Sequence, residues 1–199
     1  AAATLVMAPG YFREASEHGI AEWFENLLER SPIPVLVYNF PQRTGVTLSP
    51  DLIARLGRHE RMLGLKDSSG ERANLLAYRA SLHSEKVLYV GNETLLLEAL
   101  EAGWTGTISG AANSVPQWLA TIVQDWTEGE RISAEEKFRI LLPVLEQIRR
   151  SPQPAAHKGL LHRYGVIAEP AVRLPLLPAE DEVTELLADL IDRTTGFPA

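Results

Sequence analysis

Short apolar runs alternate with amphipathic stretches along residues 1–130. The apolar runs predict buried strands, because they are short, β-rich and bounded by turn residues. Each amphipathic stretch follows a strand and has its apolar residues at helical spacing. Strand–helix pairs repeated at roughly 20 to 30 residues predict parallel strands joined by right-handed crossovers. The predicted strands are residues 3–8, 33–37, 62–65, 87–90 and 105–110, and the predicted helices are residues 19–30, 49–57, 72–82, 94–102 and 115–126.

Beyond residue 130 the pattern changes and predicts helices alone. A long amphipathic helix is predicted over residues 133–150, where Ser133 and Glu136 have the spacing of a capping box. Prolines then interrupt the helical pattern. Two further helices are predicted, the first ending at about residue 164 and the second covering residues 179–193.

The pattern as a whole predicts an α/β fold in two parts. Residues 1–130 hold the βα units and the candidate chemistry, and residues 131–199 form helices that pack on them. Five parallel strands can form an open, doubly wound sheet of the flavodoxin type, whereas a closed (β/α)8 barrel needs eight. Taken alone, the pattern favours the open sheet.

The composition argues against several classes of protein. A formal charge of −7, with no basic stripe among aromatic residues, argues against a nucleic-acid partner. No apolar run reaches the roughly 18 residues of a membrane-spanning helix, so no membrane partner is expected. The chain has no cysteine, and its five histidines lack the spacing of metal ligands. We therefore expect a cytoplasmic protein without a metal site.

Lys66 is the residue whose position points to chemistry. It ends the third predicted strand, and the carboxyl ends of parallel strands are where α/β proteins bind ligands. The chain has only four lysines against fifteen arginines. A lysine amine that is neutral, as burial against apolar walls favours, attacks carbonyl carbons and forms Schiff bases. The alternative is a lysine whose stem lies on apolar surface while its charge stays in water.

Tyr38 ends the strand before the one that carries Lys66, so the two side chains can meet in one site. A phenol beside an amine can pass protons to and from a substrate, and Arg43 in the following loop can hold a carboxylate. Taken separately, Tyr38 is equally well explained as a strand-end tyrosine with its hydroxyl in water, and Arg43 is by default a solvated loop arginine. Ser68 and Ser69 raise the possibility of a hydrolase, but the chain has neither a G-x-S-x-G motif nor an evident histidine partner.

Two motifs together resemble the dihydrodipicolinate synthase / N-acetylneuraminate lyase family. They are residues 38–45 (YNFPQRTG) and residues 64–70 (GLKDSSG), and the resemblance extends to residues 8–11, 106–109 and 173–176. It covers essentially the whole chain. It implies a TIM (β/α)8 barrel instead of the open sheet, with about five βα units present (strands 4–8) and a C-terminal helical segment.

The resemblance further implies a class I aldolase mechanism that needs no metal and no organic cofactor. Lys66 forms a Schiff base with pyruvate, and the resulting enamine attacks an aldehyde, or the same steps run backwards. The protein is then expected to be a homodimer or homotetramer. The roles implied are proton transfer for Tyr38, completion of a neighbouring subunit's proton relay for Tyr11, the pyruvate pocket for Gly91 and Ile108, and binding of the second substrate for Arg43 and Thr44.

Among the members of the family, residues 43–45 (RTG) are more similar to the synthases than to the sialic acid lyases. We therefore expect condensation of pyruvate with aspartate semialdehyde. The alternative is an aldolase that cleaves a 2-keto-3-deoxy sugar acid or 4-hydroxy-2-oxoglutarate. Two features depart from the family: Gly10 replaces a tyrosine, and the first three βα units have no counterpart. If nothing precedes Ala1, a third interpretation is an inactive remnant that acts as a binding or oligomerisation module.

Overall fold

The computed structural model describes residues 1–195 and divides into two compact units. The first unit is Ala1–Ile108 and the second begins at Ser109. The predicted boundary at residue 130, which came from counting βα units, remains a prediction. The division between the compact units lies earlier in the chain, because the last helix of the βα series packs against the long helix that follows it and so belongs to the second unit.

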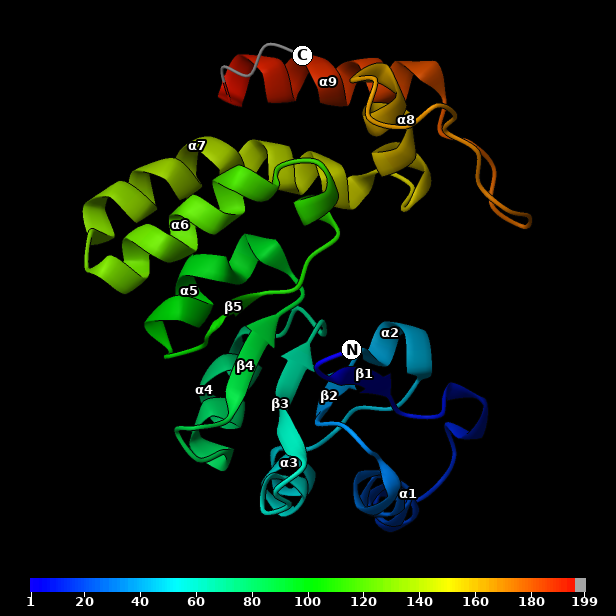
Figure 1. Cartoon of the computed structure of the whole chain (residues 1–199), viewed down its shortest axis with the longest axis vertical. Coiled ribbons are helices and arrows are strands. Elements are labelled where there is room, and N and C mark those ends of the chain that lie inside the picture. Colours follow the sequence, from blue (N-terminus) through cyan, green and yellow to red (C-terminus); the bar gives the residue numbers. More distant parts are fainter. Residues whose placement is uncertain (196–199) are drawn as a thin grey trace. The chain divides into compact units, whose positions relative to one another are not determined.

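Strands and helices alternate along the first unit (Figure 1). Its strands are β1 (Thr4–Met7), β2 (Val35–Asn39), β3 (Met62–Asp67), β4 (Val87–Val90) and β5 (Gly106–Thr107). Its helices are α1 (Glu17–Arg30), α2 (Pro41–Thr44), α3 (Pro50–Gly57), α4 (Arg72–Ser81) and α5 (Leu96–Glu101), with 3-10 turns η1 (Gly10–Phe12) and η2 (Glu93–Leu95).

In the described part of the chain these strands form one parallel sheet in the order β1-β2-β3-β4-β5. Strand order therefore follows chain order without a reversal. A doubly wound sheet reverses its order at a switch point, whereas successive strands of a (β/α)8 barrel are neighbours. The open, doubly wound sheet favoured by the pattern alone is therefore wrong.

Close packing in the sheet depends on one glycine in β3. A Cβ atom on Gly64 would lie 1.8 Å from the carbonyl oxygen of Val87 in β4. Any side chain at this position would push the two strands apart. On the helical side, the apolar faces of α1, α3 and α4 are buried, with fully enclosed side chains that include Phe24, Ile53 and Tyr78.

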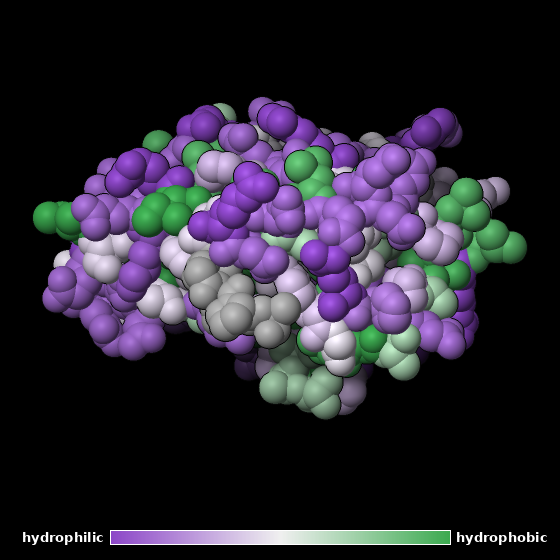
Figure 2. All heavy atoms as spheres, turned by 90° about the horizontal axis from the view of Figure 1, so that it is seen from above, coloured by the Kyte–Doolittle hydropathy of each residue, from purple (hydrophilic) through white to green (hydrophobic). Residues whose placement is uncertain are grey.

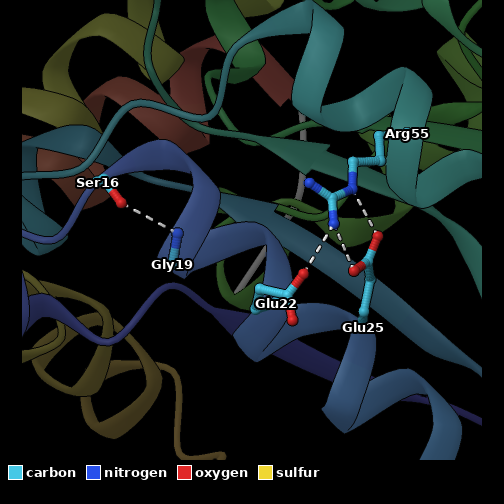
Figure 3. A network of polar contacts seen from close by, with 5 residues as sticks. All are labelled: Ser16, Gly19, Glu22, Glu25 and Arg55. Atoms are coloured by element: carbon cyan, nitrogen blue, oxygen red, sulfur yellow. Dashed lines mark hydrogen bonds and ion pairs between the residues drawn. The ribbon is translucent and has the colours of Figure 1, made fainter.

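Helices α1 and α3 are also joined at their surface by ion pairs from one arginine to two glutamates (Figure 3). Arg55 donates to both carboxylate oxygens of Glu25 at 2.7 Å and to Glu22 at 3.2 Å. These hydrogen bonds hold the pKa of Glu25 below its usual value. At the start of α1 the Ser16 hydroxyl accepts from the backbone N–H of Gly19, which caps the helix.

Two predicted elements of this unit differ from those observed. The loop expected over residues 42–45 begins as helix α2, because Pro41 starts the turn and Gly45 ends it with a left-handed φ of 69°. The fifth strand, predicted over residues 105–110, is only Gly106–Thr107. The chain leaves the sheet there, and the Ser109 hydroxyl accepts from the N–H of Ala111 in a turn.

The second unit is helical in the part that the structure describes (Figure 1). Helix α6 packs along α7, and α9 packs on α7 and α8. The capping box predicted for α7 is wrong, because the helix begins at Arg131 and Ser133 lies inside its first turn. There the Ser133 hydroxyl donates to Asp125 of α6 at 2.6 Å. The elements are η3 (Ala111–Asn113), α6 (Pro116–Glu128), α7 (Arg131–Arg150), α8 (Ala155–Arg163) and α9 (Asp181–Thr195).

The helices over residues 1–195 include none with the length and apolar content that a membrane span requires. The face shown in Figure 2 is largely hydrophilic, with hydrophobic residues scattered over it singly or in small groups. Several exposed apolar side chains lie in the segment between α8 and α9, among them Leu174 and Leu177.

The second unit contains a buried histidine. His157 in α8 is 5% exposed, and its Nδ1 lies 2.8 Å from the Ser114 hydroxyl. Its Nε2 is buried without a hydrogen-bond partner among the described residues. Burial lowers the pKa of His157 below its ordinary value, because the charged ring would have to give up its hydration.

We predict that His157 makes the stability of the second unit depend on pH. Below about pH 6.5 the unfolded chain binds a proton that the folded state excludes, so the free energy of unfolding falls as the pH is lowered. The slope from this one group is at most about 1.4 kcal/mol per pH unit. Urea unfolding between pH 7.5 and pH 5 should show this slope in the wild type and a smaller one in His157→Gln. The exposed His162 provides the matched control, and an unchanged slope in His157→Gln would contradict the prediction.

Candidate active site

The structure brings Lys66 and Tyr38 together at the carboxyl ends of neighbouring strands. Tyr38 in β2 is the direct register partner of Lys66 in β3. Register partners of parallel strands point to the same face of the sheet, and the Lys66 amine lies 4.2 Å from the centre of the Tyr38 ring. Both side chains are half-buried. The Lys66 amine and the aromatic ring of Tyr38 are therefore in contact.

Gly91 leaves room for the side chains of Lys66 and Ser68. It follows β4, and its N–H donates to the carbonyl of Asp67 at 2.7 Å. A Cβ atom on Gly91 would lie 1.8 Å from the Ser68 hydroxyl oxygen and 3.0 Å from Cε of Lys66. Only glycine at this position leaves room for both side chains in their observed places.

Ser68 is a further member of the site. The sequence pointed to it only as a possible hydrolase residue and did not predict its contact with Tyr38. Its hydroxyl donates to the Tyr38 hydroxyl at 3.2 Å. Its backbone N–H donates to the carbonyl of Asn39 at 2.9 Å, which ties the turn after β3 to the end of β2. A hydroxyl donor is therefore held against the phenol from the strand that carries Lys66.

Arg43 is connected to the same site through an aromatic ring. The Phe40 ring stacks on the Tyr38 ring, with centroids 5.6 Å apart and planes 26° apart. The Arg43 guanidinium lies 5.9 Å from the centre of the Phe40 ring. Arg43 is exposed on helix α2, so its forked donors are open to an anionic ligand.

Thr44 and Ile108 lie at the margins of the site. Thr44 is 5% exposed, and its hydroxyl donates to backbone carbonyls within its own turn, those of Phe40 and Val46. Its observed contacts therefore stabilise the helix that carries Arg43. Ile108 follows β5, with its N–H donating to Val90 next to Gly91, and its side chain is partly exposed.

Tyr11 lies apart from the Lys66–Tyr38 pair. It belongs to turn η1, is 92% exposed, and makes an edge contact with Phe12. Over residues 1–195 it has no hydrogen bond to Tyr38. Gly10 beside it packs on α2, where a Cβ atom would lie 3.0 Å from Cα of Thr44. A tyrosine at position 10 would therefore not fit this packing.

A buried polar network lies on the opposite face of the same strand ends. Asn39 and Asp67 follow Tyr38 and Lys66, pair in register, and are almost fully buried. The Asn39 amide donates to Asp67 at 2.7 Å and to the Tyr78 hydroxyl at 3.1 Å. The Tyr78 hydroxyl donates to the carbonyl of Leu48 at 2.6 Å, and the Ser69 hydroxyl donates to Asp67 at 2.7 Å.

Burial dominates the electrostatics of this network. It raises the pKa of Asp67, although the hydrogen bonds from Ser69 and Asn39 oppose the shift. It also raises the pKa of Tyr78, and the nearby charge of Asp67 adds to that effect. The network fixes the ends of β2 and β3 against α4, while Tyr38 and Lys66 lie on the other face of these strands.

Side chains alternate between the two faces of a strand, and this alternation is a sequence signal from which the network could have been predicted. If Tyr38 and Lys66 face the site, the residues after them must face the helices. A polar residue at each of these two buried positions predicts a hydrogen-bonded pair, because buried polar groups find partners. Nothing local predicts the Ser68–Tyr38 bond, because it depends on the register of two strands. In residues 1–195, no group of three or more histidine or acidic side chains could hold a metal ion.

The family model for the dihydrodipicolinate synthetase family matches residues 1–194. The chain belongs to this family. It is 34% identical over 180 residues to 4-hydroxy-tetrahydrodipicolinate synthase of Listeria welshimeri, a match that covers 90% of this chain and 61% of that relative. The chain thus spans about three fifths of the length of this curated relative.

Solved structures of family members have the same fold. Dihydrodipicolinate synthase from Thermotoga maritima matches with a TM-score of 0.93 and 26% identity, over 99% of this chain and 68% of that one. The enzyme from Acinetobacter baumannii, solved in complex with pyruvate, matches with a TM-score of 0.90 and 26% identity, over 98% of this chain and 66% of that one. The βα arrangement described above is therefore that of dihydrodipicolinate synthetase family members.

We predict that removing one hydroxyl from the buried network destabilises the first unit. Tyr78→Phe leaves the buried carbonyl of Leu48 without its donor and should lower the free energy of unfolding by about 1 to 3 kcal/mol. Urea unfolding measures the change. Tyr89→Phe is the matched control, because Tyr89 in β4 has no side-chain hydrogen bond in the described residues, and its effect should stay within about 0.5 kcal/mol. Equal effects of the two substitutions would contradict the prediction.

Proposed function

We propose that this chain carries the reactive strand ends of a pyruvate-dependent, Schiff-base-forming enzyme. The observation that supports this most directly is the contact between the Lys66 amine and the Tyr38 ring, in space left free by Gly91. The family supports the same reaction class, since the curated relative is named a synthase and a solved relative holds pyruvate. Lys66 is the electrophilic catalyst in this proposal, so the chemistry calls for no metal or organic cofactor.

In the proposed reaction the Lys66 amine attacks the keto carbon of pyruvate. The carbon–oxygen bond breaks, a proton reaches the leaving oxygen, and water departs, which leaves a protonated imine. This cation draws electrons from the adjacent methyl group, which loses a proton to become an enamine. The enamine then forms a carbon–carbon bond with an aldehyde. Tyr38 is the residue in contact with the amine that can give and take these protons.

Arg43 supports a second substrate that carries a carboxylate. Its guanidinium is exposed, and its contact with Phe40 links it to the Tyr38 ring. Guanidinium groups bind carboxylates through two parallel hydrogen bonds. We infer that the aldehyde is aspartate semialdehyde, with cleavage of a 2-keto-3-deoxy sugar acid or 4-hydroxy-2-oxoglutarate as the alternative. Thr44 would act by stabilising the turn of Arg43, and Gly91 and Ile108 would border the pyruvate.

The proposal includes an assembly beyond this chain's five strands. They would correspond to strands 4–8 of an eight-stranded barrel, since strand order follows chain order and the curated relative is longer. The exposed Tyr11 would complete the site of a second subunit in a cytoplasmic homodimer or homotetramer. An inactive remnant that serves as a binding or oligomerisation module is the opposing proposal, and the trapping experiment below distinguishes the two.

We predict that Lys66 forms a covalent imine with pyruvate. When the full-length protein is incubated with pyruvate and reduced with borohydride, mass spectrometry should find one adduct, located on Lys66. Lys66→Arg keeps the positive charge but cannot form the imine, so it should trap nothing. The matched control is Lys86→Arg, because the Lys86 amine donates to backbone carbonyls away from the site, those of His59 and Met62.

A folded wild-type protein that traps no pyruvate would overturn the enzyme proposal and favour the binding module. An adduct on Lys86, Lys137 or Lys158 would overturn the assignment of Lys66 alone. Circular dichroism before reduction confirms that each variant is folded.

We predict that Arg43 acts on the second substrate and leaves imine formation unchanged. Arg43→Gln should raise KM for aspartate semialdehyde by about 10- to 100-fold, because a charged hydrogen bond is lost. Pyruvate trapping on Lys66 should stay at the wild-type level. Arg58→Gln, at an exposed position just after α3, is the control. If Arg43→Gln affects cleavage of sugar acids but not the condensation, the aldolase alternative is the correct one.

A further inference from the structure

We propose that Ser68 is a positioning residue that holds the Tyr38 hydroxyl for proton transfer beside Lys66. This inference rests on the proposed Schiff-base function. It adds to that function a group in this chain that controls where the phenol lies and how well the phenol oxygen carries negative charge.

The first support is the hydrogen bond itself. The Ser68 hydroxyl donates to the Tyr38 hydroxyl at 3.2 Å. Over residues 1–195 it is the only group that hydrogen-bonds to this phenol. The Lys66 amine lies over the ring that carries this hydroxyl, 4.2 Å from the ring centre.

The second support is that the backbone and its surroundings fix where the Ser68 side chain lies. Its N–H donates to the carbonyl of Asn39 at 2.9 Å, so its main chain is attached to the strand that carries Tyr38. Its hydroxyl occupies space that a Cβ atom on Gly91 would take, at 1.8 Å. Because Gly91 has no side chain, the Ser68 hydroxyl has room in the place from which it reaches the phenol.

The neighbouring serine shows that the two hydroxyls have separate tasks. The Ser69 hydroxyl donates to Asp67 at 2.7 Å and accepts from Asn74 and from the N–H of Glu71. It is 6% exposed and belongs to the buried network. Ser68 is half-buried on the side of the reactive pair, and its hydroxyl bonds to Tyr38. Substitution of Ser68 therefore tests the site without removing a member of the buried network.

The chemistry gives this bond a function during loss of water. When Tyr38 passes its proton to the carbinolamine oxygen, the carbon–oxygen bond breaks, water departs, and a negative charge remains on the phenol oxygen. A hydrogen bond to a charged oxygen is about twice as strong as one between neutral groups. Ser68 keeps its own proton throughout, and Tyr38 regains a proton when the methyl group of the imine gives one up. The bond therefore strengthens at the step that needs it.

The test measures the rate at which pyruvate is trapped on Lys66 in the full-length protein. Ser68→Ala should slow trapping and turnover by about tenfold and change KM for pyruvate little. Ser68→Thr keeps a hydroxyl donor and should recover most of the rate. Ser68→Cys keeps the size of the side chain with a weaker donor and should remain slow, which covers the case of an Ala variant that does not fold.

A double-mutant cycle separates positioning from a structural role. If Ser68 acts through the phenol, adding Ser68→Ala to Tyr38→Phe should slow the reaction no further. Ser81→Ala is the matched control, because its hydroxyl donates to a backbone carbonyl at the end of α4, and it should behave as the wild type. The inference on Ser68 is wrong if Ser68→Ala traps pyruvate at the wild-type rate, or if it slows Tyr38→Phe as much as it slows the wild type. A wild type that traps no pyruvate overturns the Schiff-base function itself.

Discussion

The hydrogen bond between the Asn39 amide and the Asp67 carboxylate is the contact on which the candidate site depends. It pairs the last residues of β2 and β3 and thereby fixes their register. Successive side chains of a strand point to opposite faces, so a slip of one residue would turn Tyr38 or Lys66 away from the site. The register that satisfies the buried pair is also the register that places the phenol beside the amine.

Burying a carboxylate at this place has a cost that its neighbours offset. Desolvation raises the pKa of Asp67, and the donors from Asn39 and Ser69 compensate part of that effect. A buried polar network is stable and specific when each of its members has a partner. Here Tyr78 completes it by donating to Leu48, which anchors the segment between α2 and α3. The polar groups on the helical face thus make the strand ends rigid, while the opposite face stays open to a ligand.

On the opposite face of the strand ends, the positions of the side chains depend on glycines, which leave space because they have no side chain. Gly91 leaves room for Lys66 and Ser68, and Gly10 leaves room for the backbone of Thr44. The Phe40 ring stacks on the Tyr38 ring, and the exposed Arg43 guanidinium lies 5.9 Å from the centre of the Phe40 ring.

The amino-acid sequence by itself determined the alternation of strands and helices, the place of Lys66 and Tyr38 at strand ends, and the family, because periodicity and motifs are local properties. It did not determine the order of the strands, and pattern alone favoured a doubly wound sheet where the strands follow chain order. The short β5 and the start of α7 also departed from expectation, because strand ends and helix starts depend on neighbours in space, whereas the turn at α2 follows from the local signals of Pro41 and Gly45. The Ser68–Tyr38 bond and the Asn39–Asp67–Tyr78 network were decided by tertiary structure, since each joins residues about thirty or more positions apart whose distance depends on strand register.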